Sequence, residues 1–319
     1  MDGMTALPEL VCGDLVRSTM MPEAPGVRVH EVLARTMLES VTGDRNHRYS
    51  FAASTLARSG GVLQVKVNAA AILRREVRRR SWRCETVAVG VVDDPYQPIE
   101  GHYRLMPQVL AVLSESQTPI ALHTASPLML RDLSLLRLIG RSVPVTVSVP
   151  LATLDAGLAA RIDPSAAAPR ARLEMIARLA DAGLAPHVRI APLPPLLADG
   201  TSQLDDLLAT LADAGAARVS VSPLQLTGDD GADFFGWLAD EHPALVRRYR
   251  SLYGQRGFVS ADYALSLRGR MAPLVARYGL DSAAGVEGSD LERANLDGET
   301  ASVPPAVRAA DTAPALTLF

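Results

Sequence analysis

The chain has few of the residues on which several protein classes depend. Cysteine occurs twice in 319 residues, as Cys12 and Cys84, and two isolated thiols are typical of a reducing compartment. Aromatic residues make up 4%, too few for the stacking platforms that bind single-stranded nucleic acid. No apolar run approaches the roughly 20 residues that span a bilayer, and the N-terminus has no basic start followed by an apolar segment. These absences predict a cytoplasmic protein with no membrane contact.

Charge is nearly balanced. Lys and Arg number 32 against 35 Asp and Glu, so the formal net charge is −3 and exerts no general pull on nucleic acid. Residues 74–80 contain five arginines, but a basic run on a helix is usually a solvated face with packed aliphatic stems. We therefore do not favour a nucleic-acid partner. The 48% hydrophobic content fits one globular unit with appendages.

The middle of the chain alternates β-branched runs with amphipathic stretches. Such a pattern is typical of parallel strands that are buried on both faces and are each followed by a helix. It predicts an α/β fold, an incomplete (β/α)6 TIM-like barrel with N- and C-terminal helical extensions. The runs expected to be strands are 62–67, 86–91, 120–123, 145–149, 187–190 and 218–221, with 48–51 as a further candidate at the start.

Four segments follow from this pattern. Residues 1–47 form an N-terminal extension in which apolar spacing over 27–41 predicts a helix. Residues 48–225 form the partial barrel, and residues 226–281 a helical extension. Residues 282–319 are rich in Ala, Gly, Asp and Pro, which predicts a disordered tail, although its last four residues are largely apolar and could dock locally.

Polar residues follow two of the expected strands. Asp93 and Asp94 come after the run ending at residue 91, and His123 ends the run that starts at residue 120. Parallel barrels place chemistry at the carboxyl ends of their strands, so these three are the catalytic candidates. Adjacent carboxylates shift each other's pKa and could act as acid and base. The alternative is structural, with Asp94 capping the proline-containing turn that follows and His123 packed in the barrel. No metal site is predicted.

Several ordered motifs along the chain resemble one known family. They are Asp94-Pro95-Tyr96-Gln97-Pro98 with Glu100-Gly101, Ser126-Pro127-Leu128, Pro169-Arg170-Ala171-Arg172-Leu173, and Arg248-Tyr249-Arg250 with Leu252-Tyr253-Gly254. Together they resemble the actinobacterial branch of radical S-adenosylmethionine (SAM) proteins related to spore photoproduct lyase. The resemblance implies cofactor-side positions at Lys66, Asn68, Ser148, Arg170 and Arg172.

The sequence departs from that family where its cofactor should bind. The family holds a [4Fe–4S] cluster with a Cys-x3-Cys-x2-Cys loop after its first strand. Residues 48–53 stand either for that strand, with the loop excised, or for the segment after it, which puts Gly43, His47 and Ser50 at the cysteine positions. Short spacing to Lys66 favours excision, and both alignments leave no three-thiolate site. A family lysine is replaced by Ala125.

The resulting hypothesis is a degenerate, non-radical member of the family. It binds SAM weakly or another small anionic ligand, or acts as a partner of an unknown protein, and no [4Fe–4S] cluster or radical activity is expected. Two alternatives stay open: a non-radical enzyme that uses Asp93, Asp94 and His123, and a shortened form of an active radical SAM enzyme. We expect the three residues to share one barrel mouth with Ser148 and Arg170, and His187 to lie at the opposite end.

Overall fold

A curved, mostly parallel sheet organises the protein. The computed structural model describes residues 13–20, 28–40, 49–51, 54–57, 62–91 and 93–282. The main sheet has the order β12-β11-β10-β9-β8-β7-β4-β3, and all its described pairings are parallel except that of β3 with β4. Its strands are β3 (Leu38–Ser40), β4 (Tyr49–Phe51), β7 (Val87–Val89), β8 (Ile120–His123), β9 (Val145–Pro150), β10 (His187–Leu193), β11 (Arg218–Pro223) and β12 (Asp281–Ser282).

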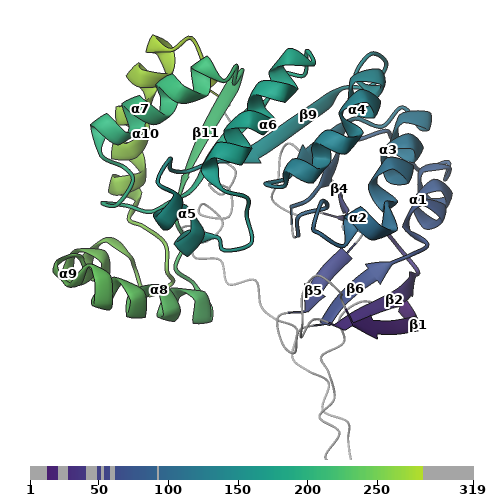
Figure 1. Ribbon diagram of the computed structural model, residues 1–319, viewed down its shortest axis with the longest axis horizontal. Coiled ribbons are helices and arrows are strands. Elements are labelled where there is room, and N and C mark those ends of the chain that lie inside the picture. The colour runs from purple at the N-terminus through teal and green to yellow at the C-terminus, as the bar shows by residue number, and fades with distance from the viewer. Residues whose placement is uncertain are drawn as a thin grey trace, which may run out of the picture.

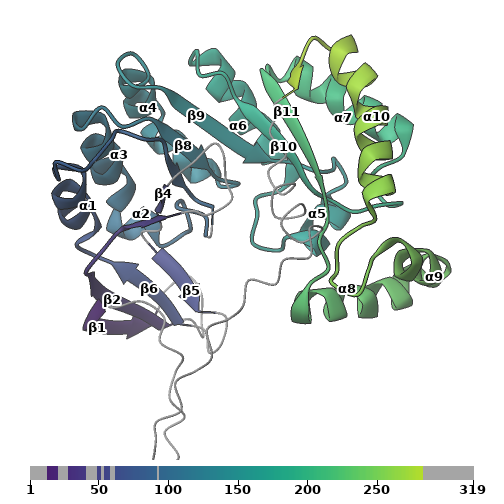
Figure 2. The same cartoon turned by 180° about the vertical axis from the view of Figure 1, so that it is seen from behind.

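Helices cover the outer side of this sheet (Figure 1 and, from behind, Figure 2). Side chains alternate between the two faces of a strand. Val147 and Val149 of β9 therefore face the helix side and share one core with Ile176 of α6, whereas Ser148 between them faces the concave side. The predicted α/β partial barrel is confirmed. The helices after the strands are α1 (Ala69–Val77), α2 (Glu100–Tyr103), α3 (Leu105–Glu115), the 3₁₀ turn η1 (Pro127–Asp132), α4 (Leu133–Ile139), α5 (Ala156–Ile162), α6 (Pro169–Asp181) and α7 (Thr201–Asp213).

One predicted barrel strand lies elsewhere. The run at 62–67 forms β6 (Val62–Lys66), which belongs to a separate sheet of order β1-β2-β6-β5. Its partners are β1 (Gly13–Met20), β2 (Arg28–Ala34) and β5 (Ser54–Ala57). The six parallel strands of the barrel are instead β4 and β7 to β11.

The helix predicted over residues 27–41 is wrong. The described part of that segment contains β2 and β3. Val29 and Val32, three residues apart, would share one face of a helix, whereas in β2 they point to opposite faces and are both buried. Short apolar runs that are buried on both faces do not separate helix from strand by periodicity alone. Pairing of β2 with β1 and β6 decides the outcome, because β-branched residues fit a pleated sheet.

The C-terminal part is helical, as expected. Helices α8 (Gly228–Glu241) and α9 (Pro243–Leu252) enclose a small core of their own, and α10 (Ala261–Arg277) packs on α7 and β11. The predicted disordered tail, its apolar last residues and Cys12 lie outside the described residues, apart from Ser282, which ends β12. Within the described ranges, no helix combines the length and apolar character that crossing a membrane would need.

Candidate functional site

Asp94 fastens the carboxyl ends of two neighbouring strands together. Its Oδ1 accepts hydrogen bonds from the backbone N–H of Tyr96 at 2.9 Å and from the hydroxyl of Thr124 at 2.7 Å, and its Oδ2 accepts one from the N–H of Ala125 at 2.7 Å. Burial raises the pKa of Asp94, and the hydrogen bonds from Thr124, Tyr96 and Ala125 act in the opposite direction. Both carboxylate oxygens are therefore used in holding the loop after β7 against the end of β8.

The rest of the same signature motif forms a buried polar network. The hydroxyl of Tyr96, a fully buried residue, donates to Asp132 at 3.1 Å. Arg131 donates two hydrogen bonds to Asp132, at 2.9 and 2.8 Å, one at 2.8 Å to the carboxylate of Glu100 and one at 3.2 Å to its backbone carbonyl oxygen. Glu100 in turn accepts from the first two N–H groups of α3. This network joins the loop after β7, η1 and α3, and explains structurally why the motif has these residues.

The concave face carries a row of polar side chains at one level across the strands. His123, Ser148 and His187 are register partners on β8, β9 and β10, and all three are buried. The Ser148 hydroxyl lies 3.1 Å from His187 Nδ1, and His187 Nε2 lies 2.9 Å from the hydroxyl of Ser220. Burial, with the charges of Arg189 and Arg218, lowers the pKa of His187 to about 4, so the ring is neutral at pH 7.

His187 therefore does not lie at the opposite end of the barrel from Ser148, and that expectation is wrong. The strands are staggered, so the first residue of β10 pairs with the fourth residue of β9. The end of β8 lies at the same level, and there the backbone of Gly90, just after β7, lies close to the backbone of His123. An added Cβ on Gly90, which has φ +94°, would lie 2.1 Å from the carbonyl oxygen of His123, which explains the glycine.

Arg172 is the buried cation at the rim of this face. It lies in the first turns of α6 and is 6% exposed, and its Nη1 donates to the carbonyl oxygen of Pro150, the last residue of β9, at 2.6 Å. Its Nε is buried with no hydrogen-bond partner in the described part of the chain. Burial lowers its pKa, and Asp163 acts in the opposite direction. Arg170, two residues earlier, is exposed.

The remaining candidate residues do not join this group. Asn68 exchanges two hydrogen bonds with the backbone of Ala34, at 2.8 and 3.0 Å, and so ties the start of α1 to β2. Lys66 is buried at the end of β6, in the separate sheet. Asp93, partly exposed, directly precedes Asp94 in the loop after β7. The structure thus brings His123 and Ser148 together, places Arg172 at the end of the strand that carries Ser148, and leaves Lys66 and Asn68 outside this group.

The thiols do not supply a donor set for an iron–sulfur cluster. The whole sequence has two cysteines. Cys84 is exposed and lies just before β7, at the amino end of the parallel strands, with its Sγ 3.4 Å from the carbonyl oxygen of Ser116. Over the described residues, no three or more His, Cys, Asp or Glu side chains gather as metal ligands would. A [4Fe–4S] cluster open at one iron needs three thiolates, so the residues present do not fit it.

Sequence reasoning missed the polar groups that hold the extensions in place. The Asp199 carboxylate, 7% exposed, accepts from the Tyr263 hydroxyl at 2.7 Å and from Arg270 at 2.9 Å, which fixes α10 to the loop after β10. Its partners lie more than 60 positions away in the sequence. The available signal was a carboxylate inside an apolar stretch, as with Asp132, since buried charges are almost always paired.

Comparison with known proteins agrees with this architecture. No family model matches the chain. Rv2578c of Mycobacterium tuberculosis and Mb2609c of Mycobacterium bovis are each 42% identical to it over 299 residues, covering 86% of this chain and 88% of each relative. The matched 86% of this chain is about 274 residues, whereas the match is 299 positions long. At about 25 of these positions the relatives therefore have residues that this chain lacks.

Solved structures of spore photoproduct lyase share the fold. One mutant form has a TM-score of 0.59 at 12% identity, covering 80% of this chain and 81% of that chain. Another, with bound AdoMet and dinucleoside spore photoproduct, has a TM-score of 0.57 at 13% identity and covers 80% of each chain.

Proposed function

The chain belongs to the family of the mycobacterial proteins Rv2578c and Mb2609c and shares its fold with spore photoproduct lyase, and from this premise we propose a non-radical function. In this proposal the protein is a radical-SAM-type barrel without the cluster site. It holds a small ligand through an anionic group, a carboxylate or phosphate, at the carboxyl edge of β9, and SAM, which has a carboxylate, is among the candidates. The observation that carries the proposal is the buried guanidinium of Arg172.

The loss of the cluster site is supported by two independent facts. The chain has two cysteines, one of them at the amino end of the strands, and three thiolates are needed. The relatives also carry about 25 residues that this chain lacks within the matched stretch, as excision of a loop would produce. The protein therefore has no means of the reductive SAM cleavage that such a cluster performs, and its chemistry, if any, is not radical chemistry.

Arg172 supports an anionic ligand. A buried charge is costly unless it is paired, and here one carbonyl oxygen is the partner of Nη1 while Nε has none among the described residues. A carboxylate or phosphate matches the planar fork of a guanidinium. If SAM is the ligand, Arg172 would hold its methionine carboxylate. Ala125 stands where the family has a lysine, so one cationic contact is missing and the affinity should be weak.

Asp94 gives little support to acid–base catalysis. Its two oxygens already accept three hydrogen bonds, two from backbone N–H groups and one from Thr124, so it has a structural task. Acting as a base would require a free oxygen within hydrogen-bond reach of a substrate. A non-radical enzyme that depends on Asp94 is therefore the weaker hypothesis.

Calorimetry on three proteins tests the proposal. Wild type, Arg172→Gln and the matched control Arg170→Gln are titrated with SAM and with methylthioadenosine, which lacks the amino-acid carboxylate. Losing an ion-paired contact to a buried carboxylate costs about 2–5 kcal/mol, so Arg172→Gln should weaken SAM binding more than tenfold and leave methylthioadenosine unaffected. Arg170→Gln should behave as wild type. Equal effects of both substitutions, or none, would refute the role of Arg172.

A further inference from the structure

β11 is paired along only part of one edge. β12 runs parallel to it and pairs with Arg218 and Val219, whereas β11 continues to Pro223 and pairs with β10 up to that residue. Along residues 220–223, the edge facing away from β10 has no partner strand among the described residues. An unpaired edge presents backbone N–H and C=O groups that a further strand can satisfy.

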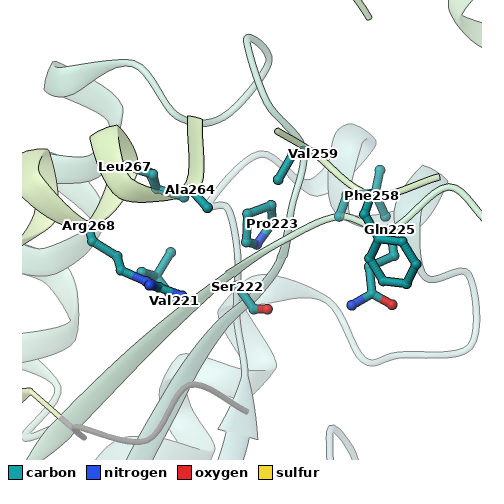
Figure 3. Close-up of a pocket in the computed structure, with 10 residues that line it drawn as sticks. Val221, Ser222, Pro223, Gln225, Phe258, Val259, Ala264, Leu267 and Arg268 are labelled. Carbon is teal, nitrogen blue, oxygen red and sulfur yellow. The ribbon is translucent and has the colours of Figure 1, made fainter. Parts of the chain in front are cut away.

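A pocket lies beside this open stretch (Figure 3). Val221 and Pro223 of β11 line it together with Ala264 and Leu267 of α10, and Arg268 and Gln225 lie at its margin. Leu267 belongs to the main core, so the pocket lies on the helix side of the sheet. Its other lining residues are Ser222, Leu224, Phe258 and Val259.

We propose that residues 283–287 of this chain, Ala-Ala-Gly-Val-Glu, prolong β12 along the open edge and fill the pocket. The chain already enters this edge in the right direction. Leu280 is buried in the main core, and the N–H of Asp281 donates to the carbonyl oxygen of Ala217 at 3.1 Å. Because β12 is parallel to β11, each further residue advances towards Pro223, and no connecting loop is needed.

The register fixes which side chains meet the pocket. Arg218 pairs with Asp281 and Val219 with Ser282, so continuing the ladder pairs Val221 with Ala284 and Pro223 with Val286. In parallel strands, paired residues point to the same face, so Ala284 and Val286 lie on the helix side. Small and apolar side chains thus meet the lining contributed by Ala264 and Leu267, and Ala283, Gly285 and Glu287 lie on the concave side.

Hydrogen–deuterium exchange of the full chain, followed by mass spectrometry, tests this inference. Amides in 283–287 should exchange about tenfold or more slowly than those in 295–310, because strand pairing protects them. Ala284→Asp puts a charge into the pocket and should abolish that protection. The matched control, Ala283→Asp, puts the same charge on the concave side and should retain it.

A second measurement monitors the pocket itself. In Val221→Cys, the thiol should react slowly with a maleimide, and it should react severalfold faster when Ala284→Asp is added, with peptide mapping to separate it from Cys12 and Cys84. Unprotected exchange over 283–287, equal effects of the two aspartates, or protection confined to 316–319 would each overturn the proposal. The last of these would assign the pocket to the apolar C-terminus instead.

Discussion

Replacing Arg172 with methionine should stabilise the ligand-free protein. A buried guanidinium loses several kcal/mol of hydration. Its one hydrogen bond within the described ranges, from Nη1 to the carbonyl oxygen of Pro150, returns about 1.5–3 kcal/mol, and Nε finds no partner there. Methionine is similar in length and fills irregular gaps. The free energy of unfolding should therefore rise by about 1–4 kcal/mol, the range seen when buried charges are replaced by apolar residues.

Urea denaturation at pH 7 measures this change, with exposed Arg170→Met as the control that should stay within about 0.5 kcal/mol of wild type. Saturating SAM should reverse the order, because it stabilises only a protein that binds it. Arg172→Met should thus raise the stability of the ligand-free protein and weaken its binding of SAM. If Arg172→Met loses about 2 kcal/mol or more without ligand, the guanidinium is already satisfied in the folded protein, and the inference of an anion site fails.

Three further substitutions follow from the geometry. Asp94→Asn should cost about 1–3 kcal/mol in urea denaturation, because an amide NH₂ cannot accept from the N–H of Ala125, and SAM affinity should be unchanged. Glu100→Gln should cost about 1–3 kcal/mol, because an amide NH₂ cannot accept a hydrogen bond, so either Arg131 or one N–H group of α3 loses its partner, while Arg131 keeps its ion pair with Asp132. The pKa of His187, lowered to about 4, makes the unfolded chain bind a proton below pH 6.5 that the folded chain does not, so folding stability is lost as pH falls. Between pH 7 and pH 5 this amounts to about 2 kcal/mol, and His187→Gln should remove it from the measured pH dependence.

Each of these has a contradicting outcome. Asp94→Asn that abolishes SAM binding at unchanged stability would restore the catalytic hypothesis for that residue. Glu100→Gln within about 0.5 kcal/mol of wild type would show that the Tyr96–Asp132–Arg131–Glu100 network does not support the fold. An unchanged pH dependence in His187→Gln, with His242→Gln as the control, would show that the imidazole takes up a proton in the folded state.

The barrel itself could be predicted from the sequence because its strands are buried on both faces. Runs such as 145–149 and 187–190 leave little alternative to a parallel α/β sheet. The N-terminal part was mistaken because apolar residues at helical spacing also suit a strand that is buried on both faces, as Val29 and Val32 of β2 are, and only the pairing of β2 with β1 and β6 decides between the two. The run at 62–67 was correctly expected to be a strand, but its sheet depends on long-range partners that local sequence does not encode.

The candidate site could be predicted by residue type but not by position. His123 follows from the rule on strand ends and Ser148 from the family resemblance, and the structure puts them side by side. The stagger between strands brought His187 next to Ser148, and no local pattern reveals a stagger. Arg170 and Arg172 could not be distinguished until the helix placed one outside and the other against Pro150. The structural task of Asp94 required the positions of Thr124 and Ala125 on the next strand.

The central claim, a radical-SAM-type barrel without its cluster, is tested most directly by anaerobic reconstitution. The full chain is incubated with iron, sulfide and reductant, desalted, and assayed for iron, for the absorbance and EPR signals of a [4Fe–4S] cluster, and for 5′-deoxyadenosine released from SAM. Two cysteines, with Cys84 at the amino end of the strands, predict no retained cluster and no deoxyadenosine. Four irons per chain that survive desalting, together with SAM cleavage, would contradict the account.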